Sequence, residues 1–148
     1  MIELSKAIKC PNIDYQLSGS KKIQEALCVQ ENLTRFLDSP EEVSKVSEFF
    51  TEMYPIVSLE SEILSKVREN PSDWVLKPQR EGGGNNFYDQ DIIDKLDSSS
   101  LDELKQYTLM KKIKANTSPA VFMREGQKYE CTRISELGVY GIVLSDGK

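Results

Sequence analysis

Histidine is absent from this chain of 148 residues. Histidine is the usual general acid or base near neutral pH, so chemistry here must rely on positioning, charge and metal ions. The three cysteines, Cys10, Cys28 and Cys131, are widely spaced and form no Cys-x-x-Cys pair. The sequence therefore argues against a structural zinc site. Reduced thiols in a cytoplasmic protein are the simplest interpretation of these cysteines.

Long apolar runs and clusters of basic residues are also missing. No apolar run approaches the roughly 20 residues that a bilayer crossing needs. Glu3, Lys6 and Lys9 interrupt any signal-peptide pattern at the start. The net charge is −5 and no stretch concentrates lysine and arginine, which the phosphates of nucleic acid require. We therefore expect neither a membrane nor a nucleic acid as a partner.

Helical patterns dominate the first half of the chain. We expect one helix from about residue 21 to 37 and another that ends at Pro55. The second starts at Ser39–Glu42, which supplies an N-cap serine, a proline at N1 and a glutamate at N3. A third helix is expected over Glu60–Glu69. The expected buried positions are Ile23, Ala26, Leu27, Leu33, Phe36 and Leu37, then Val43, Val46, Phe49, Phe50 and Met53, then Ile63, Leu64 and Val67.

Strand patterns dominate the second half of the chain. Asp89 is the expected N-cap of a helix that carries Ile92, Ile93 and Leu96, and Ser100–Glu103 is a further capping pattern. A variable stretch with Asn116 and Pro119 follows. The expected strands are Trp74–Lys77, Tyr107–Ile113, Tyr129–Leu137 and Val139–Leu144. We therefore predict an α+β fold with helices on one face of a mainly antiparallel sheet.

The segment Lys77–Asn86 is the most informative part of the sequence. It reads Lys-Pro-Gln-Arg-Glu-Gly-Gly-Gly-Asn-Asn and follows the apolar run Trp74–Leu76. Three consecutive glycines allow positive φ angles and close approach of the backbone to a ligand. A glycine triplet alone is more often a flexible turn. The flanking lysine, arginine, glutamate and asparagines favour a loop that wraps the phosphates of a nucleotide.

Five blocks of the sequence resemble the eukaryotic-type glutathione synthetases in order and spacing. They are Lys77–Asn86 with Tyr88, Leu109–Ile113, Ile134–Gly138, Lys9–Ile13 and Gly19–Gln24. The resemblance implies an ATP-grasp fold, in which two α+β lobes clamp ATP between them. Residues 1–70 would then be a helical segment of the ATP-grasp core. Residues 71–148 would form a lid-like, ATP-binding lobe with the glycine-rich loop.

The resemblance also implies an activity. The family is an ATP-dependent C–N ligase that joins γ-glutamylcysteine to glycine through an acyl phosphate, with Mg²⁺, and is typically a cytoplasmic homodimer. The chain looks like an internal part of such an enzyme, because nothing in it matches the family's N-terminal half or its C-terminal segment. Two alternatives stay open. The chain could be a truncated, non-catalytic ATP-binding module, or an interaction partner that complements a full-length synthetase.

Site residues are carried over from the family by the matching positions, and none of them is assigned as catalytic. Lys21 and Lys77 resemble the phosphate lysines, and Glu81 resembles a magnesium ligand. Lysines 21 and 22 together are also typical of a solvated helix start. Glu136, a match to a ribose carboxylate, and Tyr88 also fit ordinary surface and packing roles. The expected ATP-binding residues are Lys21, Lys77, Pro78, Gln79, Arg80, Glu81, Gly82, Gly83, Gly84, Asn85, Asn86, Tyr88, Met110, Lys111, Lys112, Ile113 and Glu136.

The block Leu109–Ile113 shows one departure from the family pattern. Lys111 stands where the family usually carries an acidic residue in the strand that runs past adenine. Backbone groups of Met110–Ile113 are expected to read the edge of the base, so the change is compatible with nucleotide binding. It would still alter the charge around the nucleotide.

Overall fold

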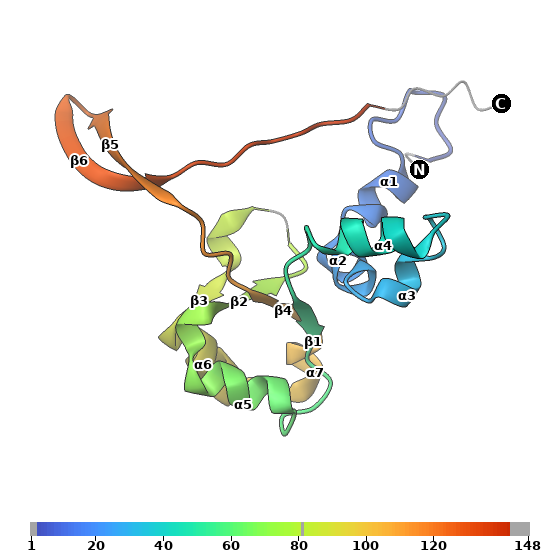
Figure 1. Cartoon of the computed structure of the whole chain (residues 1–148), viewed down its shortest axis with the longest axis horizontal. Helices are drawn as coiled ribbons and strands as arrows, with labels where there is room; N and C mark the ends of the chain where they lie inside the picture. Colours follow the sequence, from blue (N-terminus) through green and yellow to red (C-terminus); the bar gives the residue numbers. More distant parts are fainter. Residues whose placement is uncertain (1–2, 81, 143–148) are drawn as a thin grey trace. The chain divides into compact units, whose positions relative to one another are not determined.

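The computed structural model describes residues 3–80 and 82–142, and its chain divides into two compact units, residues 1–112 and 113–148 (Figure 1). No helix among the described residues is long and apolar enough to cross a membrane. The helices of the first unit are α1 (Ile13–Ser18), α2 (Lys21–Leu27), α3 (Gln30–Leu33), α4 (Pro40–Ser47), α5 (Glu62–Glu69), α6 (Gln90–Ser98) and α7 (Leu101–Leu104).

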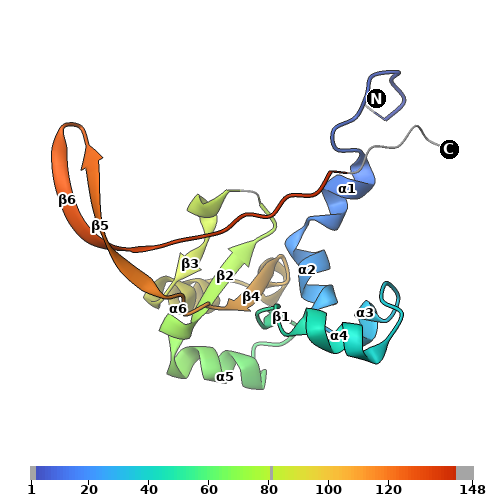
Figure 2. The same ribbon diagram turned by 45° about the horizontal axis from the view of Figure 1, so that its top comes forward.

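The first unit is built around a four-stranded antiparallel sheet with the strand order β1-β4-β2-β3 (Figure 2). Its strands are β1 (Met53–Pro55), β2 (Trp74–Pro78), β3 (Phe87–Tyr88) and β4 (Tyr107–Lys111). Met110 lies opposite Val75 on one side of β4 and opposite Met53 on the other. Because directly opposite residues point to the same face, this register fixes which side chains share each face of the sheet.

One face of the sheet carries the hydrophobic core. Figure 1 shows α5, α6 and α7 along one side of the sheet. The tightest positions are Val67, Leu76, Ile92, Leu104 and Leu109, whose side chains are 0% exposed. The nine buried members of the core cluster are Ile56, Leu64, Val67, Trp74, Leu76, Ile92, Leu96, Leu104 and Leu109. The other face is therefore left for the side chains that alternate with these along β2 and β4.

The helix expected over residues 21–37 is wrong in its extent. The structure has α2 and α3 instead, separated at Cys28 and Val29, because the backbone of Val29 is extended and starts a new helix. Leu33 is buried as expected, whereas Ile23 is 41% exposed and Phe36 is 70% exposed. A short helix, α1, also forms within the first twenty residues, where Asn12 accepts a hydrogen bond from the amide of Tyr15.

The second expected helix begins as predicted and ends early. The Oγ of Ser39 accepts a hydrogen bond from the Glu42 amide, and Val43 is buried. However, α4 ends at Ser47, and Met53 belongs to strand β1. The helical spacing of Phe49 and Met53 was misleading, because pairing with β4 decides the conformation of the chain here. The third helix is confirmed as α5 over Glu62–Glu69, with Leu64 and Val67 buried.

The elements that flank the glycine-rich loop largely match the sequence-based expectations. Strand β2 extends one residue beyond Trp74–Lys77, and β4 ends at Lys111, two residues before the expected end. Asp89 stands at the N-cap of α6 but its side chain makes no cap hydrogen bond. Ser100 does cap α7, since its hydroxyl accepts from the Glu103 amide.

The second unit contains a hairpin of β5 (Thr117–Arg124) and β6 (Gln127–Ile134). Glu125 and Gly126 join the strands with φ values of 52° and 77°, as in the type I′ turns that suit two-residue hairpins. Strand β5 occupies the stretch expected to be variable. The strand expected over residues 139–144 is absent from its described part, 139–142. The expected functional division at residue 70 stays a prediction, although β1 joins the first 70 residues to the sheet.

Candidate functional site

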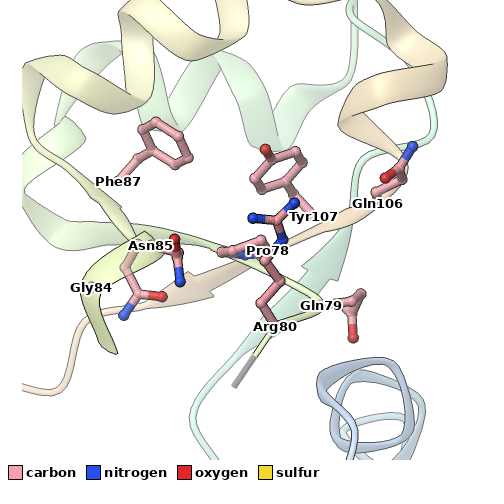
Figure 3. A pocket seen from close by; sticks show the side chains of 9 residues that line it. Pro78, Gln79, Arg80, Gly84, Asn85, Phe87, Gln106 and Tyr107 are labelled. Carbon is pink, nitrogen blue, oxygen red and sulfur yellow. The ribbon is translucent and has the colours of Figure 1, made fainter. Parts of the chain in front are cut away.

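Strand β2 positions the start of the glycine-rich loop. Lys77 is half-buried and lies opposite Thr108 of β4, on the face of the sheet away from the core. The alternation continues beyond the strand: Pro78, Gln79 and Arg80 all border a cavity, but the side chain of Gln79 hydrogen-bonds to Thr108 on the other face. Figure 3 shows Gln79 directed away from Phe87 and Tyr107 and toward the first helical part of the chain. The side chains of Lys77 and Gln79 therefore lie on one side of the loop, and the side chain of Arg80 lies on the other.

Four of the expected nucleotide-binding side chains lie on the face of the sheet that points away from the core, which we call the second face. The register places Tyr88 and Met110 on either side of Val75 in one row across the sheet. Lys77 is two residues farther along β2, so its side chain points to the same face. The ammonium group of Lys112 lies 5.8 Å from the centre of the Tyr88 ring. This face combines an aromatic ring, a thioether and two ammonium groups, which suits a flat base and a phosphate chain.

Helix α2 brings a further cation to the loop across 59 residues of sequence. The Nζ of Lys21 donates a 2.7 Å hydrogen bond to the backbone carbonyl of Arg80. The Nζ of Lys22 pairs with Glu25 at 3.2 Å and donates to the carbonyl of Tyr107 at 3.3 Å. Lys21 is thus the lysine at the loop, and Lys22 is an anchor to β4.

A cavity of about 380 Å³ opens beside the loop (Figure 3). Its polar lining comes from Arg80 and the asparagines of the loop, and the amide of Asn86 also donates to the hydroxyl of Tyr88 at 3.2 Å. The residues that line it are Pro78, Gln79, Arg80, Gly84, Asn85, Asn86, Phe87, Gln106 and Tyr107. Cationic and amide donors converge here without a carboxylate among the described lining residues, so the cavity favours an anion.

The backbone of the loop also suits a phosphate. Gly82 has φ 88° and ψ 143°, a conformation that side chains disfavour, and Gly83–Asn85 form one turn of 3₁₀-helix. Among the described residues, and apart from the immediate chain neighbours, no atom lies within 4 Å of the position that a Cβ of Gly82 or Gly84 would take. The glycines therefore serve the shape of the backbone and access to it, since no tight packing requires them. Such a turn can direct successive N–H groups at an anion.

Lys111 lies apart from the other expected side chains. It is opposite Trp74 and so faces the core side, where its Nζ pairs with Glu52 at 2.7 Å. The hydrogen bond from Lys111 and a second from the Tyr54 hydroxyl hold the pKa of Glu52 below its ordinary range. The Lys111 and Lys112 amides donate to the carbonyls of Glu52 and Asp73. The amides of Lys111 and Lys112 are therefore already hydrogen-bonded within the protein. Any N–H group of this segment that contacts the edge of a base must belong to another residue.

Three expected residues are not placed at this site by the structure. Ile113 and Glu136 belong to the second compact unit. Glu81, the expected magnesium ligand, lies outside the described residues. Among the residues that are described, no group of three acidic or thiol side chains could hold a metal ion.

Sequence reasoning missed five residues that shape the site. Phe87, Gln106 and Tyr107 line the cavity. Lys22 and Thr108 connect the loop, α2 and β4 to one another. Tyr107 was assigned only to a strand, and nothing in its neighbours indicates a cavity. The capping pattern Ser100–Glu103 was one available signal, because it implies that a helix ends and β4 begins near Gln106.

Comparisons with known proteins show the family of the chain. Residues 2–148 match the family model described as the ATP-binding domain of eukaryotic glutathione synthase. The chain is 40% identical over 147 residues to the chloroplastic glutathione synthetase of Solanum lycopersicum, covering 97% of this chain and 27% of that protein. It is 37% identical over 150 residues to glutathione synthetase of Dictyostelium discoideum, covering 99% and 32%. The chain thus spans about a third or less of these relatives.

A solved structure supports the fold. The apo form of a glutathione synthetase-like effector from Globodera pallida aligns with 85% of this chain and 26% of that chain, with a TM-score of 0.61 and 24% sequence identity. At that identity the likeness concerns the fold alone. The family match covers nearly the whole chain, residues 2–148. The chain belongs to the family of eukaryotic glutathione synthase ATP-binding domains.

Proposed function

We propose that this chain is the ATP-binding part of a glutathione synthetase, which ligates γ-glutamylcysteine and glycine with ATP and Mg²⁺. The observation that carries the proposal is the contact between Lys21 and the carbonyl of Arg80, 2.7 Å long, which brings α2 to the glycine-rich loop. Lys77 leaves β2 beside the same loop. Two lysines that are far apart in sequence are thus both attached to the loop that would hold the phosphate chain.

These lysines have a clear task in the proposed reaction. The carboxylate of the dipeptide attacks the γ-phosphorus of ATP, and the bond to the leaving ADP breaks. The glycine amine then attacks the acyl phosphate and expels phosphate. Charge shifts along the phosphates in the first step, and ammonium groups held at Lys21 and Lys77 neutralise it. Backbone amides of Gly82–Gly84 and the amides of Asn85 and Asn86 add neutral donors.

The proposed contacts to adenosine come from the second face of the sheet. Tyr88, Met110 and Lys112 would pack against or near the base, and the backbone up to Ile113 would run along its edge. Glu136 would accept hydrogen bonds from the ribose hydroxyls, and Glu81 would bind Mg²⁺ together with phosphate oxygens. The cation–π contact of Lys112 and Tyr88 supports a role for this face in binding a flat, charged ligand.

The assembly and compartment are part of the same proposal. The chain spans about a third or less of its relatives, so we propose that it works within a homodimeric enzyme or with a complementing chain. The cytoplasm is the proposed compartment, because Cys10, Cys28 and Cys131 are all free thiols. The tomato relative is named chloroplastic, which is a statement about that protein. Sedimentation of the natural assembly and cell fractionation test these two points.

The direct test is calorimetric titration of the chain with ATP, with and without Mg²⁺. We expect micromolar to millimolar affinity that strengthens with Mg²⁺, because the metal neutralises the phosphates. Glu81→Gln should remove most of the Mg²⁺ dependence. Lys77→Ala should weaken ATP binding by on the order of 1.5–3 kcal/mol, the usual worth of a charged hydrogen bond.

Lys66→Ala is the matched control for the Lys77 change. Lys66 lies on α5, where its ammonium group pairs with Glu62, and it has no place in the proposed site. Its removal should leave the affinity for ATP unchanged. A folded chain that binds no ATP, or equal affinities for Lys77→Ala and the unsubstituted chain, would contradict the proposed function.

A further inference from the structure

The side chain of Gln79 uses both of its polar ends within the protein. Its Oε1 accepts a 3.2 Å hydrogen bond from the backbone amide of Lys22, and its Nε2 donates a 3.1 Å hydrogen bond to the Oγ1 of Thr108. One amide thus bridges helix α2 and strand β4. One acceptor position and one N–H of this amide are thus committed to protein partners, which is half of its hydrogen-bonding capacity.

At the helix end of the bridge, Gln79 supplies an acceptor for a backbone amide in the first turn of α2. The first amides of an α-helix lack partners within the helix, and a side chain at the N-cap usually accepts from one of them. Ser20, the N-cap residue of α2, makes no side-chain cap hydrogen bond. Gln79 accepts from the second residue of α2 instead, so a residue of the loop caps the helix from 57 positions away in sequence.

The strand end of the bridge is rigid. Thr108 is 0% exposed and lies in β4, between β1 and β2 in the four-stranded sheet. Its hydroxyl is the acceptor for Gln79. The neighbouring residue, Tyr107, accepts at its carbonyl from the Nζ of Lys22. Adjacent positions of β4 therefore connect to the first turn of α2, Tyr107 directly and Thr108 through Gln79.

The residue held by this arrangement is Lys21, which precedes Lys22 and reaches the carbonyl of Arg80. We propose that Gln79 is a positioning residue: its side-chain amide clamps α2 to Thr108 and so holds the ammonium group of Lys21 at the phosphate end of the loop. The inference rests on the proposed ATP binding and deepens it. The backbone of Gln79 remains part of the loop, while its side chain acts through Lys21.

Thr108 gives the sharpest test, because a fully buried side chain cannot contact a nucleotide. Thr108→Val keeps the shape and removes the hydroxyl, whereas Thr108→Ser keeps the hydroxyl. Affinity for Mg²⁺–ATP would be measured by calorimetry, and folding by thermal denaturation. We expect Thr108→Val to weaken binding about two- to tenfold, which corresponds to one lost neutral hydrogen bond. Thr108→Ser should bind like the unsubstituted chain.

The double variant with Lys21→Ala separates positioning from a general loss of structure. If Thr108 and Gln79 act through Lys21, Thr108→Val should have no further effect once the ammonium group is gone. Gln79→Met should mimic Thr108→Val, because methionine has a similar length and no polar ends. Gln79 is exposed, so this variant remains informative if Thr108→Val does not fold. Gln90→Met is its control, since Gln90 bonds only to Asp94 within α6 among the hydrogen bonds of the described residues.

The outcomes separate this inference from the proposed function. If Lys21→Ala weakens ATP binding but Thr108→Val and Gln79→Met do not, the clamp is wrong and the ATP site stands. The clamp is also wrong if the effects of Thr108→Val and Lys21→Ala simply add. If the unsubstituted chain binds no ATP, the proposed function fails and takes this inference with it.

Discussion

At the scale of single residues, the site depends on alternation along one extended segment. Lys77 and Gln79 point to the face that carries Tyr88 and Met110, while Arg80 points into the cavity with Tyr107. A shift of one residue in the register of β2 would exchange these two sets of side chains. The glycines that follow supply backbone shape, and Gly82 does so through a positive φ.

Gly82→Ala should therefore destabilise the chain, whereas Gly84→Ala should not. Both positions have room for a Cβ, but only Gly82 has a φ of 88°. Conformations of this kind cost other residues about 1–3 kcal/mol. Urea denaturation of the two variants would measure the difference in the free energy of unfolding. Equal stabilities would show that the loop changes its conformation at no cost when a side chain is added.

Tyr54 should make the stability of the chain depend on alkaline pH. Its hydroxyl donates a 2.7 Å hydrogen bond to Glu52, which raises the pKa of Tyr54 from 10.0 to about 12, with burial adding to the shift. Because the folded state holds this proton more tightly, the stabilisation is complete below pH 10 and is lost as the pH rises toward about 12.

Tyr54→Phe isolates this contribution. Urea midpoints of the unsubstituted chain and the variant would be compared at several values between about pH 9 and pH 12. The unsubstituted chain should lose more stability over this range than the variant, since phenylalanine has no proton to release. Parallel losses in the two proteins would rule out Tyr54 as the source of the alkaline dependence.

At the scale of elements, local sequence patterns predicted the helices and helix caps that depend on local interactions. The α5 helix and the caps of α4 and α7 follow from short sequence signals, and all three are present. The sequence could not indicate that Met53 leaves its helical pattern, because the competing interaction is a strand pair with Met110, 57 positions away. Likewise Pro119 suggested a loop, yet it lies within β5 opposite Thr132.

The same limit applied to the site. The glycine-rich loop, Lys21 and Lys77 were recognisable within motifs, and the resemblance assigned their expected roles. The bridge from Gln79 to Thr108 was not recognisable, because it arises where α2 packs near the sheet. The cavity was not recognisable either, because it forms where the glycine-rich loop, β3 and the start of β4 come together. Contacts between elements that are distant in sequence do not change the spacing of apolar residues in either element, so that spacing could not predict them.

Two serines at helix starts should respond differently to removal of the hydroxyl. Ser39 accepts from the Glu42 amide at 3.2 Å and caps α4. Ser61 stands at the same position of α5 without a cap hydrogen bond, and its Oγ is buried with no partner in the described part of the chain. Ser39→Ala should cost about 1 kcal/mol, the usual worth of an N-cap.

Ser61→Ala should be neutral or stabilising, because a buried hydroxyl without a partner costs free energy. Urea denaturation of both variants gives the comparison directly. A loss for Ser61→Ala as large as that for Ser39→Ala would mean that Ser61 makes a hydrogen bond to ordered water or to a rearranged α5.

At the scale of the whole molecule, burial is concentrated in one of the two compact units. Every buried apolar residue of the described chain lies between Leu33 and Leu109, and none of residues 113–142 is buried. The hairpin of β5 and β6 has only two strands, and an isolated two-stranded hairpin is marginally stable in water. The first unit therefore has the means to fold by itself, and the second does not.

This asymmetry predicts the behaviour of the separated units. A chain that ends at Lys112 should unfold cooperatively with a melting temperature within about 5 °C of the whole chain, a shift worth roughly 1 kcal/mol. The fluorescence of Trp74, the single tryptophan and a buried one, would report its unfolding. A peptide of residues 113–142 should show the circular dichroism of an unstructured chain. Loss of cooperative unfolding in the shortened chain would show that the second unit completes the core, and a folded peptide would show that the hairpin has a source of stability beyond its described contacts.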